Sequence, residues 1–123
     1  MQTELIQISD YELTVDVHEF TEAATALADR VEQDGLDGLT RYCFYVDEET
    51  RTAGAVIVFR DPMTWADHHQ LVAGWDEYNR FRDTVSLSKI EFLGDLPAEL
   101  AAGIEQAGID YRHLGPFAAG FVR

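Results

Sequence analysis

Residues 39–59, LTRYCFYVDEETRTAGAVIVF, contain the pattern that decides the fold. Two runs rich in aromatic and β-branched residues, 39–46 and 53–59, flank the polar segment 47–51. Runs of this composition favour strands, and the polar segment between them predicts the exposed turn of a β-hairpin. The second run is almost continuously apolar, which is typical of an interior strand covered on both faces. We therefore expect this strand inside a sheet, with something besides the chain's own helices covering one of its faces.

A helix is predicted before the hairpin. Asp16 precedes Glu19 by three residues, the spacing of a capping box in which each side chain satisfies a free backbone amide at the start of a helix. Apolar residues then recur at helical spacing and form one stripe: Phe20, Ala23, Ala24, Leu27 and Val31. Gly35 follows Asp34, and glycine tolerates the left-handed conformation that closes many helices. The pattern predicts a helix that ends at this glycine.

A second helix is predicted after the hairpin. Asp61 is a favoured cap residue, and Pro62 follows it at the first helical position, where proline is common. The apolar pattern continues to about Phe81, with Gly74 weakening the middle of the helix.

The remaining segments complete the order of elements. Strands are predicted over Thr3–Leu13 and Ser86–Leu93, a short helix over Ala98–Ala107, and a last glycine-broken strand or extended tail over Tyr111–Val122. The order is β-α-β-β-α-β followed by α-β. The first six elements are those of a split βαβ, ferredoxin-like α+β fold, and the rest form a C-terminal αβ extension. With no repeat or linker in the sequence, residues 1–123 are expected to form one domain.

The charge balance is the strongest compositional signal. Twenty-three carboxylates face nine basic residues, the formal net charge is −14, and Lys89 is the only lysine. Such a field repels nucleic acid and anionic lipid, so neither is expected as a partner. Two explanations of the acidity stay open: a protein kept soluble in a high-salt cytoplasm, or an acidic protein from a genome that favours arginine over lysine.

Other features indicate a soluble cytoplasmic protein. The start, Met1-Gln2-Thr3-Glu4, has no basic region followed by an apolar run, so no secretory signal is expected. No stretch approaches the roughly 18 apolar residues of a membrane span. Cys43 is the only cysteine, which excludes an internal disulfide. Its position inside a strand-forming run indicates a small core residue and not a nucleophile, which needs an electropositive, partly exposed setting.

The segment 59–68, FRDPMTWADH, resembles the antibiotic biosynthesis monooxygenase family of the dimeric α+β barrel superfamily. In that family a strand ends in an aromatic residue, a polar turn follows, and the next helix presents an aromatic or apolar residue and then a histidine. Phe59, Trp65 and His68 stand at these places. The segments 45–49, 91–95 and 120–123 are also similar to the hairpin and the tail of some members.

The resemblance implies a homodimer in which two sheets pack into a barrel, with a pocket between each sheet and its helices. It implies a cofactor-independent monooxygenase acting on a small aromatic or quinol substrate, without cofactor or metal. The alternative is a non-catalytic dimeric barrel that binds a small hydrophobic ligand or serves a stress response. Haem binding is a third option. Haem-degrading relatives use a set of asparagine, tryptophan and histidine. Asn79 is the only asparagine of this chain and has no clear place in that set.

The two adjacent histidines are the candidate catalytic residues. On a helical wheel, Trp65, His69 and Val72 share one direction, and His68 lies beside it, so both histidines border the buried stripe. A histidine near neutral pKa can take a proton from a phenol and return it, which makes His68 the candidate base and His69 the alternative. The competing interpretation is a buried histidine with a structural role. Adjacent helical residues rarely chelate one ion, so the pair does not indicate a metal site.

Aromatic and apolar residues around the hairpin and second helix are the candidate pocket. They could line a flat ligand site or form core and dimer interface. Strand alternation places Tyr42 and Phe44 on one face and Cys43 on the other. Three arginines, Arg60, Arg80 and Arg82, could anchor an anionic ligand or pair with carboxylates. The predicted pocket residues are Trp65, Phe59, Tyr42, Phe44, Val72 and Trp75.

Overall fold

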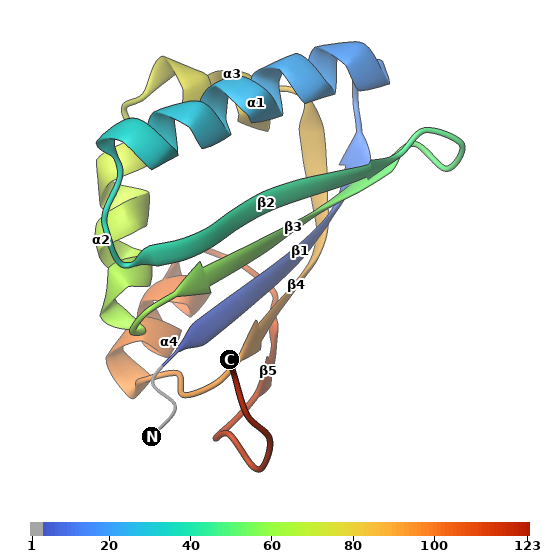
Figure 1. Ribbon diagram of the computed structural model, residues 1–123. Coiled ribbons are helices and arrows are strands. Elements are labelled where there is room, and N and C mark those ends of the chain that lie inside the picture. Colours follow the sequence, from blue (N-terminus) through green and yellow to red (C-terminus); the bar gives the residue numbers. More distant parts are fainter. Residues whose placement is uncertain (1–3) are drawn as a thin grey trace.

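The computed structural model describes residues 4–123, whose sheet carries its helices on one face (Figure 1). The strands lie in the order β2-β3-β1-β4-β5, with β5 parallel to β4 and the other neighbours antiparallel. This is the predicted ferredoxin-like α+β arrangement with a C-terminal αβ extension. The elements are β1 (Leu5–Leu13), α1 (Val17–Asp34), β2 (Leu39–Asp47), β3 (Thr52–Phe59), α2 (Met63–Val72), α3 (Asp76–Arg82), β4 (Val85–Leu93), α4 (Ala98–Gln106) and β5 (Arg112–Leu114).

The predicted hairpin is β2 and β3, and β3 is the interior strand that its composition indicates. Residues of β3 alternate between buried and half-buried, because every second side chain faces the helices. The first strand was predicted from Thr3, which lies outside the described residues, as do Met1 and Gln2 of the predicted leader-free start. Among residues 4–123, no helix has both the length and the apolar character that a bilayer crossing requires.

The start of α1 follows the prediction and its end does not. The backbone N–H of Glu19 donates to Oδ1 of Asp16 at 2.8 Å, so Asp16 caps the helix. At the other end, Gly35 is extended, with φ −84° and ψ −174°, and not left-handed. Glycine is required there for a different reason: a Cβ would press against the carbonyl oxygen of Val31.

Removal of the cap should destabilise the fold measurably. We expect Asp16→Ala to lower the free energy of unfolding by about 1 kcal/mol, because one backbone donor at the start of α1 loses its acceptor. Urea unfolding measures this change. Glu32→Ala, an exposed carboxylate of the same helix, is the matched control and should change stability by less than about 0.5 kcal/mol. Equal effects of the two substitutions would contradict the capping role.

The predicted second helix is two helices, α2 and α3, separated at residues 73–75. Asp61 caps α2, since its Oδ1 accepts from the backbone N–H of Met63 at 3.0 Å and of Thr64 at 3.2 Å. The helix ends at Val72, and Trp75 adopts an extended backbone, with φ −82° and ψ 135°. The break lets α3 change direction and lie beside α1. The apolar residues keep helical spacing on both sides of residues 73–75, so the sequence pattern predicted one continuous helix.

The final strand is shorter than the predicted 111–122. Only Arg112–Leu114 pairs with β4, and the backbone N–H of Gly94 donates to the Leu114 carbonyl at 2.9 Å. Pro116 follows soon after, and a proline has no N–H with which to continue a ladder. The rest of the tail is irregular and exposed.

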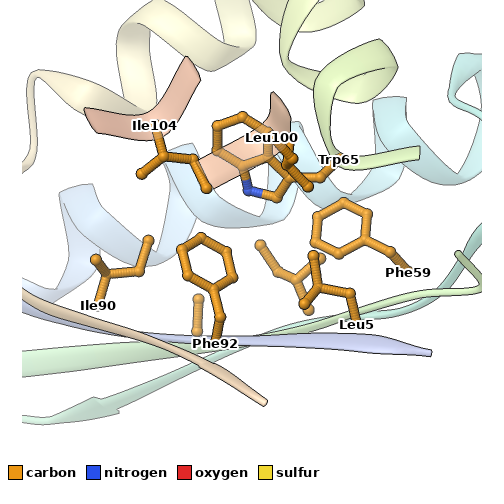
Figure 2. Packing of buried hydrophobic residues seen from close by; sticks show 9 residues of the cluster. Leu5, Phe59, Trp65, Ile90, Phe92, Leu100 and Ile104 are labelled. Carbon is orange, nitrogen blue, oxygen red and sulfur yellow. The ribbon is translucent and has the colours of Figure 1, made fainter. Parts of the chain in front are cut away.

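Two clusters of buried side chains join the sheet to the helices. One contains Leu5 and Phe92 of the sheet and Trp65, Leu100 and Ile104 above them (Figure 2). The other joins α1 and α3, where the rings of Phe20 and Phe81 lie 5.9 Å apart. Between these clusters the packing leaves a cavity.

The outer face of the sheet carries no helix. Ile8 of β1, Val56 of β3 and Cys43 of β2 are in register there, and Ile6 is in register with Val58. All five are half-buried. We call this set of residues the outer sheet face.

Candidate functional site

A cavity of about 470 Å³ lies between the sheet and its helices. Its size is within the range of small-molecule sites. Its walls combine apolar side chains with phenols, imidazoles and one guanidinium. The lining residues are Gln7, Ser9, Tyr11, Leu27, Tyr42, Phe44, Ile57, Trp65, His68, His69, Tyr78, Phe81, Arg82, Val85, Leu87, Ile90, Ala107 and Ile109.

Trp65 is held by hydrogen bonds in the cavity wall. Its indole Nε1–H donates to Oε1 of Gln7 at 2.8 Å, and Nε2 of Gln7 donates to Oγ of Ser9 at 3.0 Å. All three side chains are buried. The indole therefore has one orientation, because rotation would leave a buried donor without a partner.

His68 is a buried imidazole that packing alone holds in place. Its ring is 2% exposed and contacts the rings of Tyr42, at 5.4 Å between centroids, and of Phe59, at 6.1 Å. Its Nδ1 is buried and has no hydrogen-bond partner among residues 4–123. Burial, and to a lesser degree neighbouring His69, lowers the pKa of His68 to about 4. The ring is neutral at pH 7 and can accept a proton.

His69 lies in the wall under different constraints. Its Nδ1 lies 2.8 Å from the Trp65 carbonyl oxygen, and since a carbonyl only accepts, Nδ1 carries the proton. Its ring stacks on the Trp65 indole with centroids 4.1 Å apart. Burial lowers the pKa of His69, and the bond to the carbonyl opposes part of that shift. Both histidines thus line the cavity, but only His69 has a fixed tautomer.

Three tyrosines line the cavity: Tyr11, Tyr42 and Tyr78. Burial raises the pKa of Tyr42, and neighbouring Tyr11 and Tyr78 raise it further. Burial also raises the pKa of Tyr11. At pH 7 Tyr11 and Tyr42 are therefore phenols, which can donate hydrogen bonds to a ligand.

The structure brings together some of the predicted site residues and separates others. Trp65, Tyr42 and Phe44 line the cavity with both histidines. Three others do not line this cavity: Phe59, Val72 and Trp75.

Each of the three residues outside the cavity wall has a packing role. Phe59 is 0% exposed at the end of β3, where it fills the first cluster. Val72 is 0% exposed in the second cluster. Trp75 also belongs to the second cluster, under the guanidinium of Arg30, which lies 4.2 Å from the ring centroid. Trp75 lies in the break between α2 and α3.

Polar residues of β1 and α3 complete the cavity wall. The sequence signal for Gln7, Ser9 and Tyr11 is their spacing of two, in phase with buried Leu5 and Leu13.

Tyr78 and Arg82 reach the cavity because α3 turns away from the axis of α2. No signal in the sequence gives that turn.

The charged candidates divide between the cavity and the surface. Arg82 lines the cavity with its guanidinium 5.8 Å from the ring centroid of Tyr78, whereas Arg80 pairs with Glu22 at 3.4 Å. Across the described part of the chain, no three His, Cys, Asp or Glu side chains are grouped so that they could hold a metal ion.

Burial of His68 predicts acid sensitivity. The unfolded chain binds a proton at the ordinary pKa of 6.5, whereas the folded ring does so only near 4. The unfolded state therefore binds more protons in this interval, and stability falls as the pH drops from 6.5 toward 4. We expect wild type to lose roughly 2.5 kcal/mol more than His68→Gln between pH 7 and 4.5, measured by urea unfolding.

The control for this measurement is His18→Gln. The His18 side chain is 83% exposed, so its replacement should leave the loss of stability with acid close to that of wild type. If His68→Gln loses as much stability as wild type over the same interval, the imidazole is not held neutral by the fold.

Comparison with known proteins gives matches in structure only. No known family matches the sequence, and no curated protein does. MupZ from Pseudomonas fluorescens is similar with a TM-score of 0.75 and 14% identity, over 98% of this chain and 95% of that one. That alignment omits so little that it must include the C-terminal extension.

Two further structures indicate the kind of fold. SnoaB from Streptomyces nogalater, a cofactor-independent oxygenase, has a TM-score of 0.64 and 9% identity, over 78% of this chain and 96% of that one. A Caulobacter crescentus protein, provisionally described as an antibiotic biosynthesis monooxygenase, has a TM-score of 0.60 and 15% identity, over 78% and 92%. The chain therefore has the fold of the antibiotic biosynthesis monooxygenases, and identities this low establish the fold alone.

Proposed function

We propose that this chain is a cofactor-independent monooxygenase that acts on a small aromatic or quinol substrate in the cavity, with His68 as the base. The observation that carries the proposal is a neutral, buried imidazole without a hydrogen-bond partner on Nδ1, in the wall of a cavity of about 470 Å³. The fold shared with SnoaB, itself a cofactor-independent oxygenase, supports the same class of reaction.

The reaction starts with a proton transfer inside the cavity. The imidazole of His68 takes the hydroxyl proton of the phenol, and the resulting phenolate is electron-rich enough to reduce O2. Because burial disfavours an isolated imidazolium, the transfer is favourable only while the phenolate stays beside the ring as its counter-charge. The phenols and apolar side chains around it exclude water and keep the two charges close.

The oxygen step balances without a cofactor. The phenolate passes two electrons to O2 in single-electron steps, and a C–O bond forms at a ring carbon that carries hydrogen. The peroxide takes the proton held by His68. Loss of the C–H proton and cleavage of the O–O bond then release water and leave a carbonyl, so that one oxygen atom enters the product and the other becomes water.

A second candidate function is binding of a small hydrophobic molecule without turnover. It is favoured by the composition of the cavity wall, in which apolar residues outnumber the tyrosines and histidines. The same cavity then serves as a receptor, and the structural role of His68 is to fill its wall.

Association with a second copy is part of the proposal. The outer sheet face presents apolar side chains in register on three strands and carries no helix. A second identical face would cover it and give the two-sided burial that the composition of β3 indicates.

Oxygen consumption with 1-naphthol and a panel of related phenols and quinols tests the enzymatic proposal. In ¹⁸O2, we expect one labelled oxygen in the quinone product and one in water, with one O2 consumed per product formed. Saturable binding of these compounds with no oxygen uptake across the panel would establish the second candidate and exclude the first.

A further inference from the structure

The wall of the cavity differs in charge from the rest of the molecule. The chain carries 23 aspartates and glutamates and a net charge of −14. None of them is among the residues of the described range 4–123 that line the cavity. Arg82 is the one arginine or lysine in that wall. The cavity therefore offers a fixed positive charge on a protein whose overall field repels anions.

Arg82 forms no ion pair within residues 4–123, although carboxylates are abundant. Its guanidinium contacts the ring of Tyr78, with 5.8 Å from Cζ to the ring centroid. Arg80 stands in the same last turn of α3 and pairs with Glu22 at 3.4 Å. Three other basic side chains also pair with carboxylates: Arg30, Lys89 and Arg112. A guanidinium has five N–H donors, and a ring contact leaves those of Arg82 available to a ligand.

Arg82 and His68 lie at different depths of the cavity. Arg82, Leu87 and Ala107 line the cavity and are exposed, so they form its mouth. His68 lines the same cavity at 2% exposure, and its Nδ1 has no hydrogen-bond partner within residues 4–123. A ligand that fills the cavity thus meets a neutral imidazole at its inner end and a guanidinium at its outer end. Apolar and aromatic side chains line the space between them.

We propose that Arg82 is a specificity-determining residue that binds a carboxylate of the ligand at the mouth of the cavity. The ligand class is then an aromatic acid with a hydroxyl group at the end remote from its carboxylate. The hydroxyl reaches His68, and the guanidinium holds the carboxylate through two parallel N–H donors, the geometry that arginine provides and lysine lacks. This inference rests on the proposed function in placing the ligand in this cavity, and it holds with or without turnover.

Two matched probes test the inference without oxygen chemistry. The first, 6-hydroxy-2-naphthoate, carries a carboxylate; the second, 6-hydroxy-2-naphthamide, has the same shape and hydroxyl group but no charge. Equilibrium dialysis under nitrogen at pH 7 gives both dissociation constants. We expect the wild type to bind the acid more tightly than the amide. Arg82→Met should weaken binding of the acid about 3- to 10-fold, as for a charge pair partly screened by solvent, and leave binding of the amide nearly unchanged.

Arg80→Met is the matched control, because it removes the same charge from the same turn of α3 outside the cavity wall. Both substitutions change the field of the whole molecule equally, so a difference between them reports the local contact at Arg82. Arg82→Lys keeps the charge without the planar fork and should restore part of the lost affinity for the acid. The difference between wild type and Arg82→Met should shrink as NaCl rises from about 50 to about 500 mM, because salt screens the pair.

Three results would overturn the inference. One is a wild-type protein that binds the acid no better than the amide, or binds neither. Another is equal weakening of acid binding by Arg82→Met and Arg80→Met. The third is equal weakening of both probes by Arg82→Met, which would indicate that the side chain only fills space at the mouth. All three are read from binding without oxygen, so a failure of the oxygenase proposal, which is read from oxygen uptake, remains distinguishable.

Discussion

Replacement of His68 by glutamine is expected to lower kcat for oxygen consumption by about 10²- to 10⁴-fold, the usual contribution of a positioned general base. Glutamine fills most of the imidazole volume and keeps a polar end, but its amide cannot hold a transferred proton. Substrate binding relies on the remaining walls, so KM should change by less than about tenfold. Steady-state oxygen uptake with any phenol that the wild type oxidises measures both constants.

His69→Gln is the matched control for this substitution. His69 already donates its Nδ1 proton to the Trp65 carbonyl, and its ring is stacked on the indole. Its loss should disturb the wall without removing the base, with an effect well below that of His68→Gln. Equal losses from the two substitutions, or none from either, would contradict the assignment of the base.

The pH dependence of kcat/KM tests the assignment of His68 as the base independently of the substitutions. A base must be unprotonated in the free enzyme, and burial places the pKa of His68 near 4. Activity on a neutral phenol should therefore stay level from pH 8 to about pH 5 and fall as the pH drops through 4. A fall centred near 6.5 would indicate that an exposed histidine is responsible.

Introduction of a carboxylate at the centre of the outer sheet face should abolish association. Val56 is half-buried there, in register with Ile8 on one side and Cys43 on the other. In a two-fold symmetric pair, Val56→Glu places one charge from each copy in the same apolar interface. Each unpaired buried carboxylate costs several kcal/mol, so we expect the dissociation constant to rise by at least about 10³-fold.

Sedimentation velocity at micromolar concentration, over a range of salt, measures this change. Gln70→Glu adds the same charge at an exposed position of α2 and is the control, which should associate like wild type. Because each copy carries a net charge of −14, association of both proteins should strengthen as salt screens the repulsion. A monomeric wild type at every salt concentration, or a Val56→Glu protein that still pairs, would exclude the proposed interface.

Most of the fold could be predicted because the signals for it are local. The hairpin, the Asp16 cap and the Asp61-Pro62 helix start depend on residues within a few positions of one another. The end of α2 could not be predicted in this way. Gly74 weakens a helix by only about 1 kcal/mol relative to alanine, and the burial of Trp75 against α1 decides the break.

The candidate site was predicted from one side only. The helix pattern around Trp65 indicated which residues border the cavity from above. The side of the cavity formed by β1 was ambiguous, because both sets of alternating residues on this strand contain apolar side chains. Leu5 and Leu13 belong to one set, and Ile6 and Ile8 belong to the other. Alternation alone does not decide which set faces the helices.

The break at residues 73–75 divides the site between two independently supported segments. The histidines belong to α2, whose packing on the sheet fixes their surroundings. Tyr78, Phe81 and Arg82 belong to α3, which is tied to α1 by the 2.8 Å ion pair of Arg30 and Glu77. Selection, or a protein engineer, can therefore reshape the choice of substrate through α3 while the reactive imidazole keeps its environment.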